Sequence, residues 1–272
     1  MLTYGPRPPA LFVPDTLCYN SKMEKFFAPI LLLALLFPTL TLGDTQKIEI
    51  SLPGERPKDA LFSSPGENKK YPAIVYMHGG AVRERGNPVY KQNGDFLFDI
   101  NDKVLDFSSM GFVVLAPLRN TVKGCCNGDD AIKEGIAISR ASAKYLKSLP
   151  NVRQNKICLV GYSEGALISM WVMTEPSDFS VAIIMSASSQ CGMRRAGSEN
   201  YCAKNLIKSG KLENITKKII LTLGDSEKKA HTRTINGFAK KLKKRINILE
   251  GDHRSFSNPR NDVSSIIKNN CS

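Results

Sequence analysis

From residue 46 onward, the chain alternates between two kinds of apolar pattern. Short runs in which neighbouring or alternate residues are apolar are typical of strands, and longer segments with apolar residues three and four apart are typical of helices. The predicted strands are 46–52, a segment near 59–62, 73–77, 111–117, 156–160, 180–186, 218–223 and 246–249. The predicted helices are 96–107, a long helix from Asp129 or Asp130 to about Leu149, 166–173, 232–245 and 261–270, and the segments 82–94, 118–128 and 187–216 are predicted loops.

This order of elements predicts the fold class. Strands that alternate with helices form βαβ units, which place the strands parallel to one another. The expected fold is therefore α/β, with a mainly parallel central sheet and helices on both faces. The pattern contains no internal repeat and no linker, so we expect residues 44–272 to form one domain.

The first 43 residues have a different character. The apolar run 26–37 follows Lys22 and Lys25, and Thr41-Leu42-Gly43 places small residues where a signal peptidase cuts. Met23 is the more natural start, which makes residues 1–22 an upstream extension. An uncleaved anchor is the alternative, but the apolar run is short and interrupted for a full span. We predict export to the periplasm or the medium, cleavage near Gly43, and no stable membrane insertion afterwards.

The net charge of +13 and the pI of about 9.4 raise the question of a nucleic-acid partner. The basic residues are scattered, however, and the only dense run, 240–245, falls in a predicted helix. No nucleic-acid motif accompanies it. We therefore predict a soluble basic surface that favours anionic envelopes or substrates, and no nucleic-acid partner.

Because disulfides persist in oxidising compartments, we expect some cysteines of an exported protein to be paired. The six beyond the leader are Cys125, Cys126, Cys158, Cys191, Cys202 and Cys271. Cys191 and Cys202 bracket a polar loop and are the best local pair. Cys158 lies in a predicted central strand and is expected to be a buried thiol. The alternative for Cys191 and Cys202 is free thiols or pairing with a distant cysteine such as Cys271. The spacing fits no metal site.

The segment 156–173 contains the motif Gly161-Tyr162-Ser163-Glu164-Gly165 between a predicted strand and a predicted helix. In this context, the Gly-x-Ser-x-Gly pattern predicts a nucleophile elbow, which is a strained turn that holds the serine hydroxyl clear of the sheet. The glycines flank the serine because a Cβ there would collide with the neighbouring backbone. The simpler interpretation is a strand–helix connection with glycines for packing.

From about residue 46 to the end, the chain resembles an α/β-hydrolase, and within that superfamily it is most similar to the dienelactone hydrolase-like and prolyl oligopeptidase-like branch. The resemblance rests on the elbow and on four further stretches in the same order as in the family, which are 77–80, 111–117, 223–227 and 251–253. It implies a catalytic triad in the order serine, acid, histidine.

Three histidines compete for the role of the base that activates the serine hydroxyl. His78 precedes the serine in a His-Gly-Gly turn and is expected to shape the oxyanion loop. His231 falls at a helix start, where a solvated surface histidine is the simpler interpretation. His253 follows the last strand, where the family keeps its base. We therefore assign Ser163 as nucleophile and His253 as base.

Two carboxylates compete for the acid that orients the imidazole. Asp225 and Glu227 both lie in the loop after the strand 218–223. The resemblance favours Glu227 by its distance from the strand-ending glycine, whereas aspartate is the commoner acid. We rank Glu227 slightly ahead and keep both.

An oxyanion hole needs backbone donors aimed at the developing negative charge. The Glu164 N–H follows the nucleophile, and the second donor is expected from Gly80 or Ala81, after the His-Gly-Gly turn. The alternative is an ordinary strand-ending turn.

These residues predict hydrolysis of an ester or related acyl bond of a small molecule or peptide, through an acyl-enzyme and without a metal or organic cofactor. One alternative is a serine peptidase of the prolyl oligopeptidase type. A non-catalytic α/β-hydrolase scaffold that only binds ligands is another.

Overall fold

The computed structural model describes residues 44–54, 56–91, 94, 96–119, 128–189, 200–257 and 263–272. The predicted leader, residues 1–43, lies outside these ranges, as do Cys125, Cys126 and Cys191. Within the described ranges, no helix is both long enough and apolar enough to cross a membrane.

The strands and helices follow one another largely as predicted. The strands are β1 (Gln46–Ile50), β2 (Lys58–Ser63), β3 (Tyr71–Met77), β4 (Val89–Tyr90), β5 (Phe96–Phe98), β6 (Val113–Pro117), β7 (Val152–Tyr162), β8 (Val181–Met185), β9 (Lys218–Gly224) and β10 (Ile246–Leu249). The α-helices are α1 (Gly80–Arg85), α2 (Ile100–Ser109), α3 (Gly128–Ser148), α4 (Glu164–Met173), α5 (Ala203–Lys208), α6 (Lys229–Leu242) and α7 (Ser264–Cys271), and the 3₁₀ helices are η1 (Lys211–Asn214) and η2 (His253–Ser257).

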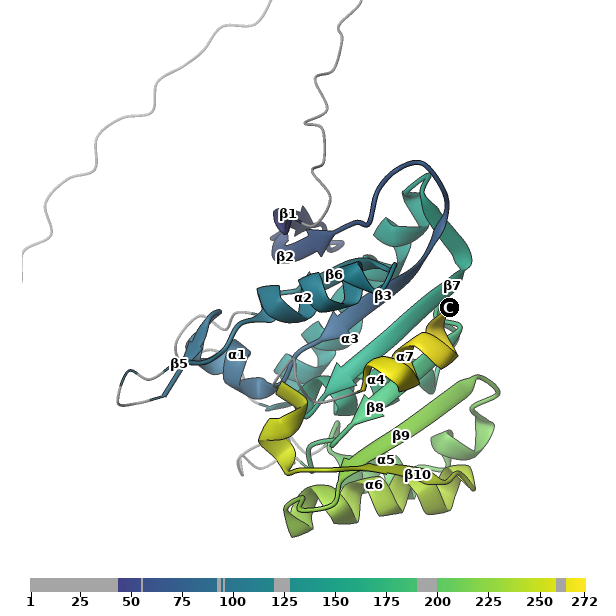
Figure 1. The fold of residues 1–272 in the computed structure, drawn as a ribbon. Coiled ribbons are helices and arrows are strands. Elements are labelled where there is room, and N and C mark those ends of the chain that lie inside the picture. Colours follow the sequence, from purple (N-terminus) through teal and green to yellow (C-terminus); the bar gives the residue numbers. More distant parts are fainter. Residues whose placement is uncertain are drawn as a thin grey trace, which may run out of the picture. The chain divides into compact units, whose positions relative to one another are not determined.

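Among the described residues, eight strands form one sheet in the order β1-β2-β6-β3-β7-β8-β9-β10. The six strands β6-β3-β7-β8-β9-β10 are parallel to one another, while β1 and β2 are antiparallel to each other and β2 is antiparallel to β6 (Figure 1). The predicted α/β fold with a mainly parallel sheet is confirmed.

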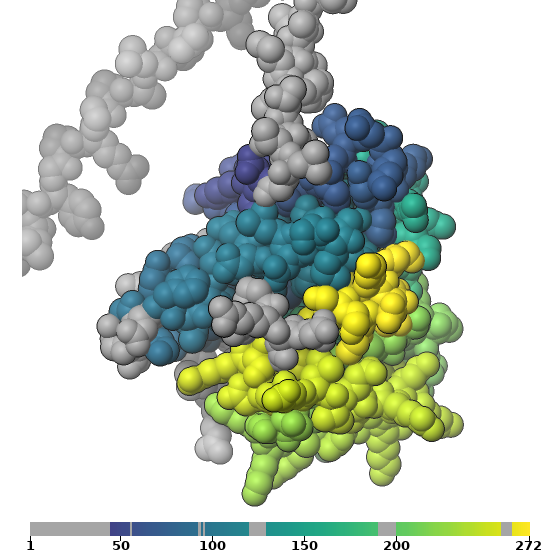
Figure 2. Space-filling model, viewed as in Figure 1, coloured from purple at the N-terminus to yellow at the C-terminus, as the bar shows by residue number. Residues whose placement is uncertain are grey.

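The two faces of the sheet are covered by different helices, as the alternation of side chains along each strand requires. In β3, Val75 packs in one core cluster with residues of α3, α4 and α6, whereas Ile74 packs in a second cluster with residues of α2 and α7. The central strands therefore consist almost wholly of apolar residues, because both of their faces are buried. Figure 2 shows α7, in yellow, on the same face of the molecule as the teal of α2.

Three predicted segments differ from the structure. The predicted helix 96–107 is strand β5 followed by α2, because Asp99 is extended and caps α2 by accepting the Asn101 N–H at 2.8 Å. The predicted loop 82–94 contains most of α1 and the strand β4, and the predicted loop 187–216 contains α5 and η1. α1 and α5 have six residues each, which is too short for a helical period to be recognised.

The prediction that Cys158 is a free buried thiol is wrong. Cys158 forms a disulfide with Cys271, the last residue of α7. Cys158 points to the face of the sheet that α7 covers, which places the two sulfur atoms together. Cys202 is buried and carries a free thiol, which contradicts the predicted bridge to Cys191.

The parallel strands all end at one edge of the sheet, where ligands bind in folds of this kind. β3 leads there into Gly79, β7 into Ser163, β9 into the loop with Glu227, and β10 into His253. The fold thus brings segments that are far apart in the sequence to one place.

Candidate active site

Ser163 occupies a tight turn between β7 and α4. Its φ of 55° is unusual for a residue with a Cβ. The turn is possible because the two flanking residues are glycines and have no Cβ. A Cβ on Gly161 would overlap the start of α4, and one on Gly165 would overlap the carbonyl of Met77. The Ser188 N–H donates to the Ser163 carbonyl at 2.9 Å and fixes the turn from the side of β8. The backbone therefore has the geometry expected of a nucleophile elbow.

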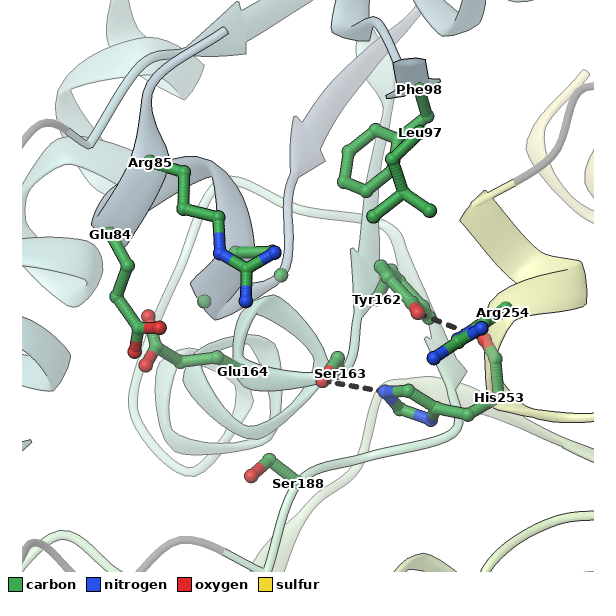
Figure 3. A pocket seen from close by; sticks show the side chains of 13 residues that line it. Glu84, Arg85, Leu97, Phe98, Tyr162, Ser163, Glu164, Ser188, His253 and Arg254 are labelled. Carbon is green, nitrogen blue, oxygen red and sulfur yellow. Dashed lines mark hydrogen bonds between the residues drawn. The ribbon is translucent and has the colours of Figure 1, made fainter. Parts of the chain in front are cut away.

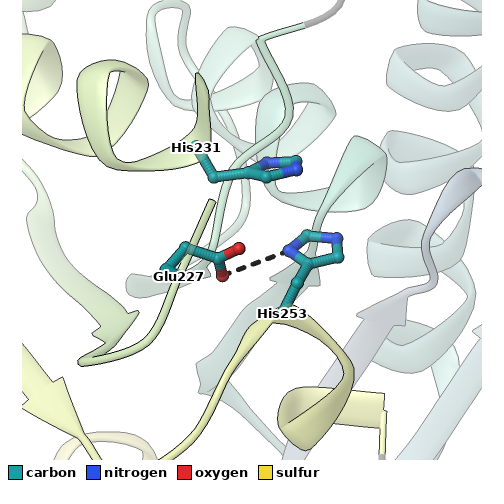
Figure 4. Close-up of side chains that lie close together, drawn as sticks. All are labelled: Glu227, His231 and His253. Carbon is teal, nitrogen blue, oxygen red and sulfur yellow. Dashed lines mark hydrogen bonds and ion pairs between the residues drawn. The ribbon is translucent and has the colours of Figure 1, made fainter. Parts of the chain in front are cut away.

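The structure brings the predicted serine, histidine and glutamate into one hydrogen-bonded chain. Nε2 of His253 lies 3.0 Å from Oγ of Ser163, and Nδ1 of the same ring lies 3.2 Å from Oε2 of Glu227 (Figures 3 and 4). A carboxylate only accepts hydrogen bonds, so the proton of the neutral ring lies on Nδ1. Nε2 is then left to accept the serine proton.

The packing distinguishes between the two candidate acids. Asp225 is exposed, and its Oδ1 accepts the Gly251 N–H at 3.0 Å and the Ser226 hydroxyl at 2.9 Å. The side chain of Glu227, in contrast, is fully buried against His253. Of the two candidate acids, Glu227 is thus the one that is hydrogen-bonded to the imidazole, and Asp225 braces the turn beside it.

The surroundings of His253 favour its neutral form. Burial lowers the pKa of His253 the most, and His231 lowers it further, while Glu227 opposes both. A base must be unprotonated to accept the serine proton, so this direction suits the role of general base near neutral pH.

The predicted oxyanion donors face the same pocket as Ser163. Glu164 is the first residue of α4, and Gly80 and Ala81 are the first residues of α1. The first N–H groups of a helix have no acceptor within that helix. A Cβ on Gly79 would lie only 3.1 Å from the Tyr162 ring, so a glycine there lets the two turns approach each other.

Comparisons with known proteins identify the fold. The chain superposes on a fungal esterase from Rhizomucor miehei with a TM-score of 0.62 and 12% identity, over 85% of this chain and 82% of that one. An esterase from Pyrococcus furiosus gives a TM-score of 0.56 and 15% identity, over 79% of this chain and 86% of that one. The chain has the α/β-hydrolase fold.

The remaining similarities are partial. The model of the family described as "BAAT / Acyl-CoA thioester hydrolase C terminal" matches residues 140–248 of this chain. The uncharacterized peptidase YtmA of Bacillus subtilis (strain 168) is 26% identical over 115 residues, which are 42% of this chain and 40% of that protein. The Pyrococcus horikoshii acylaminoacyl peptidase gives a TM-score of 0.61 and 16% identity, over 87% of this chain and 43% of that one. The chain thus matches less than half the length of these two peptidases.

Behind the expected oxyanion donors lies a cluster of buried charges. The Glu164 side chain points away from Ser163 (Figure 3). Its carboxylate accepts from Arg119 at 2.7 Å and from Arg83 at 3.0 and 3.1 Å. The side chains of Glu164 and Arg119 are 3% and 0% exposed. Burial alone would raise the pKa of Glu164, but Arg119 and Arg83 outweigh burial and lower it.

The same arginine organises the His-Gly-Gly turn. The Arg119 backbone N–H donates to Nε2 of His78 at 3.1 Å, so Nδ1 carries the proton and donates to the Gly79 carbonyl at 2.9 Å. The Arg119 guanidinium also donates to the His78 carbonyl. Burial and the charge of Arg119 lower the pKa of His78 to about 3. His78 is therefore a neutral structural residue beside the expected oxyanion loop.

Sequence reasoning missed Arg119 and Arg83. Arg119 lies in a predicted loop and Arg83 in a predicted polar segment, where an arginine is usually solvated. The one local signal was the glutamate that follows Ser163, because a carboxylate next to a buried elbow requires a cation.

The pocket beside Ser163 has a volume of about 290 Å³ (Figure 3). Its walls come from α1 and β5 and from the segments that follow β3, β7, β8 and β10. The lining residues are Gly79, Gly80, Ala81, Glu84, Arg85, Leu97, Phe98, Tyr162, Ser163, Glu164, Ser188, His253 and Arg254.

His231 contacts the triad and is not the solvated histidine considered from the sequence. Its ring stacks on that of His253 at a centroid distance of 4.0 Å, with 20° between the planes (Figure 4). With Glu227, the two histidines have the side-chain types of a zinc site, and one donor atom of each lies within 4.8 Å of the others. An imidazole lone pair lies in the ring plane, however, and two stacked, nearly parallel planes do not converge on one ion. The arrangement supports the imidazole and does not fit a shared metal ion.

The charge cluster leads to a prediction about stability. Glu164→Gln should lower the free energy of unfolding by roughly 3–5 kcal/mol, because it leaves the buried Arg119 guanidinium without its counter-charge. Glu84→Gln is the matched control, since Glu84 is bound to the same Arg83 but its side chain is 53% exposed. The control should stay within about 0.5 kcal/mol of wild type in urea unfolding.

The pH dependence gives a second check of the same prediction. A carboxyl whose pKa is lowered by folding adds stability above its unfolded pKa, and this stability is lost as the pH falls through the lowered one. The wild type and Glu164→Gln should therefore converge in stability in acid. Equal losses in the Glu164 and Glu84 variants would contradict the buried ion pair.

The triad geometry leads to a prediction about the acid. Glu227→Gln should reduce kcat by roughly 10⁴, because an amide at this position can hold the imidazole in the wrong tautomer. Asp225→Asn is the matched control from the same loop and should lose little activity. Steady-state kinetics on an activated acyl ester would measure both, and a larger loss in the Asp225 variant would reverse the assignment.

Proposed function

We propose that the protein is a serine hydrolase that cleaves an ester or a related acyl bond through an acyl-enzyme. The observation that carries this proposal is the unbroken hydrogen-bonded chain from Ser163 through His253 to the buried Glu227. Ser163 and His253 line a pocket that the first residues of α1 and α4 also line, so the backbone N–H groups of these helix starts lie beside the serine.

In the first half of the proposed reaction, Oγ of Ser163 attacks the acyl carbon as Nε2 of His253 accepts its proton. The carbonyl oxygen becomes an oxyanion and accepts hydrogen bonds from the Glu164 N–H and from Gly80 or Ala81. Glu227 stabilises the protonated imidazole. His253 then returns the proton to the leaving group as its bond to the acyl carbon breaks.

In the second half, a water molecule takes the place of the leaving group. His253 accepts a proton from this water as its oxygen attacks the acyl-enzyme. The tetrahedral intermediate collapses, the proton returns to Ser163, and the carboxylic acid leaves. The reaction needs no group beyond the side chains and backbone amides that the site contains.

The leaving group distinguishes the enzyme classes within this mechanism. An oxygen leaving group defines an esterase, a sulfur a thioesterase and a nitrogen a peptidase. The matched relatives are named as esterases and peptidases, and the matched family model carries a thioesterase description. We propose esters as the principal substrates because the two esterases match over most of their own length. A peptidase is the second candidate, favoured by the relative named as a peptidase.

A covalent probe tests the proposal directly. A fluorophosphonate should label the wild type at Ser163, because a hydroxyl activated by a base attacks phosphorus as it attacks an acyl carbon. Ser163→Ala should abolish both labelling and turnover while the melting temperature stays close to that of the wild type. Ser188→Ala, at the other serine of the pocket, should still be labelled.

The result also separates the alternatives. A folded wild-type protein that neither reacts with the probe nor hydrolyses any acyl substrate would be a binding scaffold. Rates on matched ester, thioester and amide substrates of one acyl group would then assign the class, and faster turnover of the amide would favour the peptidase.

We also propose that the protein acts outside the cytoplasm. The apolar run 26–37 supports export, and the Cys158–Cys271 disulfide is of a kind that persists in oxidising compartments. Amino-terminal sequencing of the protein recovered from the producing cells checks this. A chain that begins near Asp44 supports export, and an intact leader on a cytoplasmic protein excludes it.

A further inference from the structure

The imidazole of His253 is held by contacts of two kinds. In its plane, Ser163 and Glu227 bind its two nitrogens. Out of its plane, the ring of His231 stacks on it at 4.0 Å and the ring of Tyr162 lies tilted at a centroid distance of 5.0 Å. The hydrogen bonds orient the nitrogens, and the rings limit how far the imidazole can tip.

His231 is itself fixed from a third direction. It lies in the first turn of α6, and its Nδ1 lies 3.1 Å from the Ala187 carbonyl. A carbonyl only accepts, so Nδ1 carries a proton and donates it. Ala187 precedes Ser188, whose N–H binds the Ser163 carbonyl. One side chain thus connects the base to the chain segment that braces the nucleophile.

The stack also has an electrostatic consequence. Positive charge on His231 would lie 4.0 Å from the imidazolium that His253 must become, and like charges at that distance repel. The other charged or titratable groups that face or adjoin His253 among the described residues are Glu227 and Lys228 before α6, Tyr162 at the end of β7, and the sequence neighbours Asp252 and Arg254. Glu227 favours protonation of His253, whereas His231 and Lys228 oppose it.

We propose that His231 is a positioning residue that holds the His253 ring in place and opposes its protonation before substrate binds. The kinetic test of this inference rests on the proposed hydrolase function, whereas the titration of the histidine rings does not. It explains why a histidine that takes no part in the triad is packed against its base. The direction of the pKa shift of His253, to which His231 contributes, agrees with it.

Two variants separate the ring of His231 from its hydrogen bond. His231→Asn keeps a side-chain donor near the position of Nδ1 and removes the stacked ring, whereas His231→Phe keeps a ring and removes the donor. Arg233→Gln is the matched control, because it removes a cation from an exposed position on the same helix. The measurements are kcat and KM against pH, together with the NMR titration of the histidine ring protons.

His231→Asn should lower kcat on the order of tenfold with little change in KM, within the range that a displaced catalytic group can cost. The acid limb of kcat/KM should move to higher pH, because the group that opposed protonation of His253 is gone. His231→Phe should keep more of the wild-type kcat than His231→Asn. Arg233→Gln should match the wild type in kcat and in pH profile.

The titration makes the outcome independent of enzymatic activity. The chain has three histidines, and the pKa of His78 is about 3. The chemical shifts of the His78 ring protons should therefore not change near neutral pH. The His253 signals should titrate at higher pH in His231→Asn than in the wild type. An unchanged His253 titration overturns the inference even if the wild type hydrolyses esters. A uniform loss of rate at every pH, with a lowered melting temperature, overturns it as well, since that is the effect of a purely structural residue.

Discussion

The buried ion pairs of Glu164 connect the parts of the site that must keep a fixed distance from one another. Glu164 supplies a backbone N–H beside Ser163, and its carboxylate binds Arg119 after β6 and Arg83 in α1. Charges this far from water are stable only when they are paired and hydrogen-bonded. The cluster therefore restricts α4, α1 and the segment after β6 to one arrangement. α1 begins with Gly80 and Ala81, so both sets of expected oxyanion donors lie on elements joined by these ion pairs.

The opposite side of the site is held by contacts of a different type. His253 lies on a short segment after the last strand, where the backbone alone would leave it several orientations. Glu227 and Ser163 fix it within its plane, and the rings of Tyr162 and His231 contact it from outside that plane. A fixed cluster of charges on the oxyanion side thus faces an imidazole whose proton affinity is adjusted by its neighbours. Such a division suits a reaction in which charge must be stabilised at one place and a proton moved at the other.

The disulfide extends this arrangement to the end of the chain. Cys158 lies in β7, the strand that leads to Ser163, and Cys271 closes α7. The segment that carries His253 is therefore attached at its beginning to the sheet through β10 and at its end to β7 through the bridge. Ser163 follows β7 and His253 precedes α7, so the disulfide joins the two elements that lie next to these residues in the chain.

The sequence by itself determined the features that depend on local geometry. The alternation of apolar runs predicted the order of strands and helices, and the glycines around Ser163 predicted the elbow, because both follow from backbone conformation and side-chain period. The position of His253 followed from the family pattern alone. Tertiary structure decided the rest. Asp225 and Glu227 are nearly equivalent in sequence, and only the packing of their loop against His253 separates them. The buried role of Arg119, the stack of His231 and the pairing of Cys158 depend on contacts between residues far apart in the chain, whose distances are set by the way the helices pack on the two faces of the sheet.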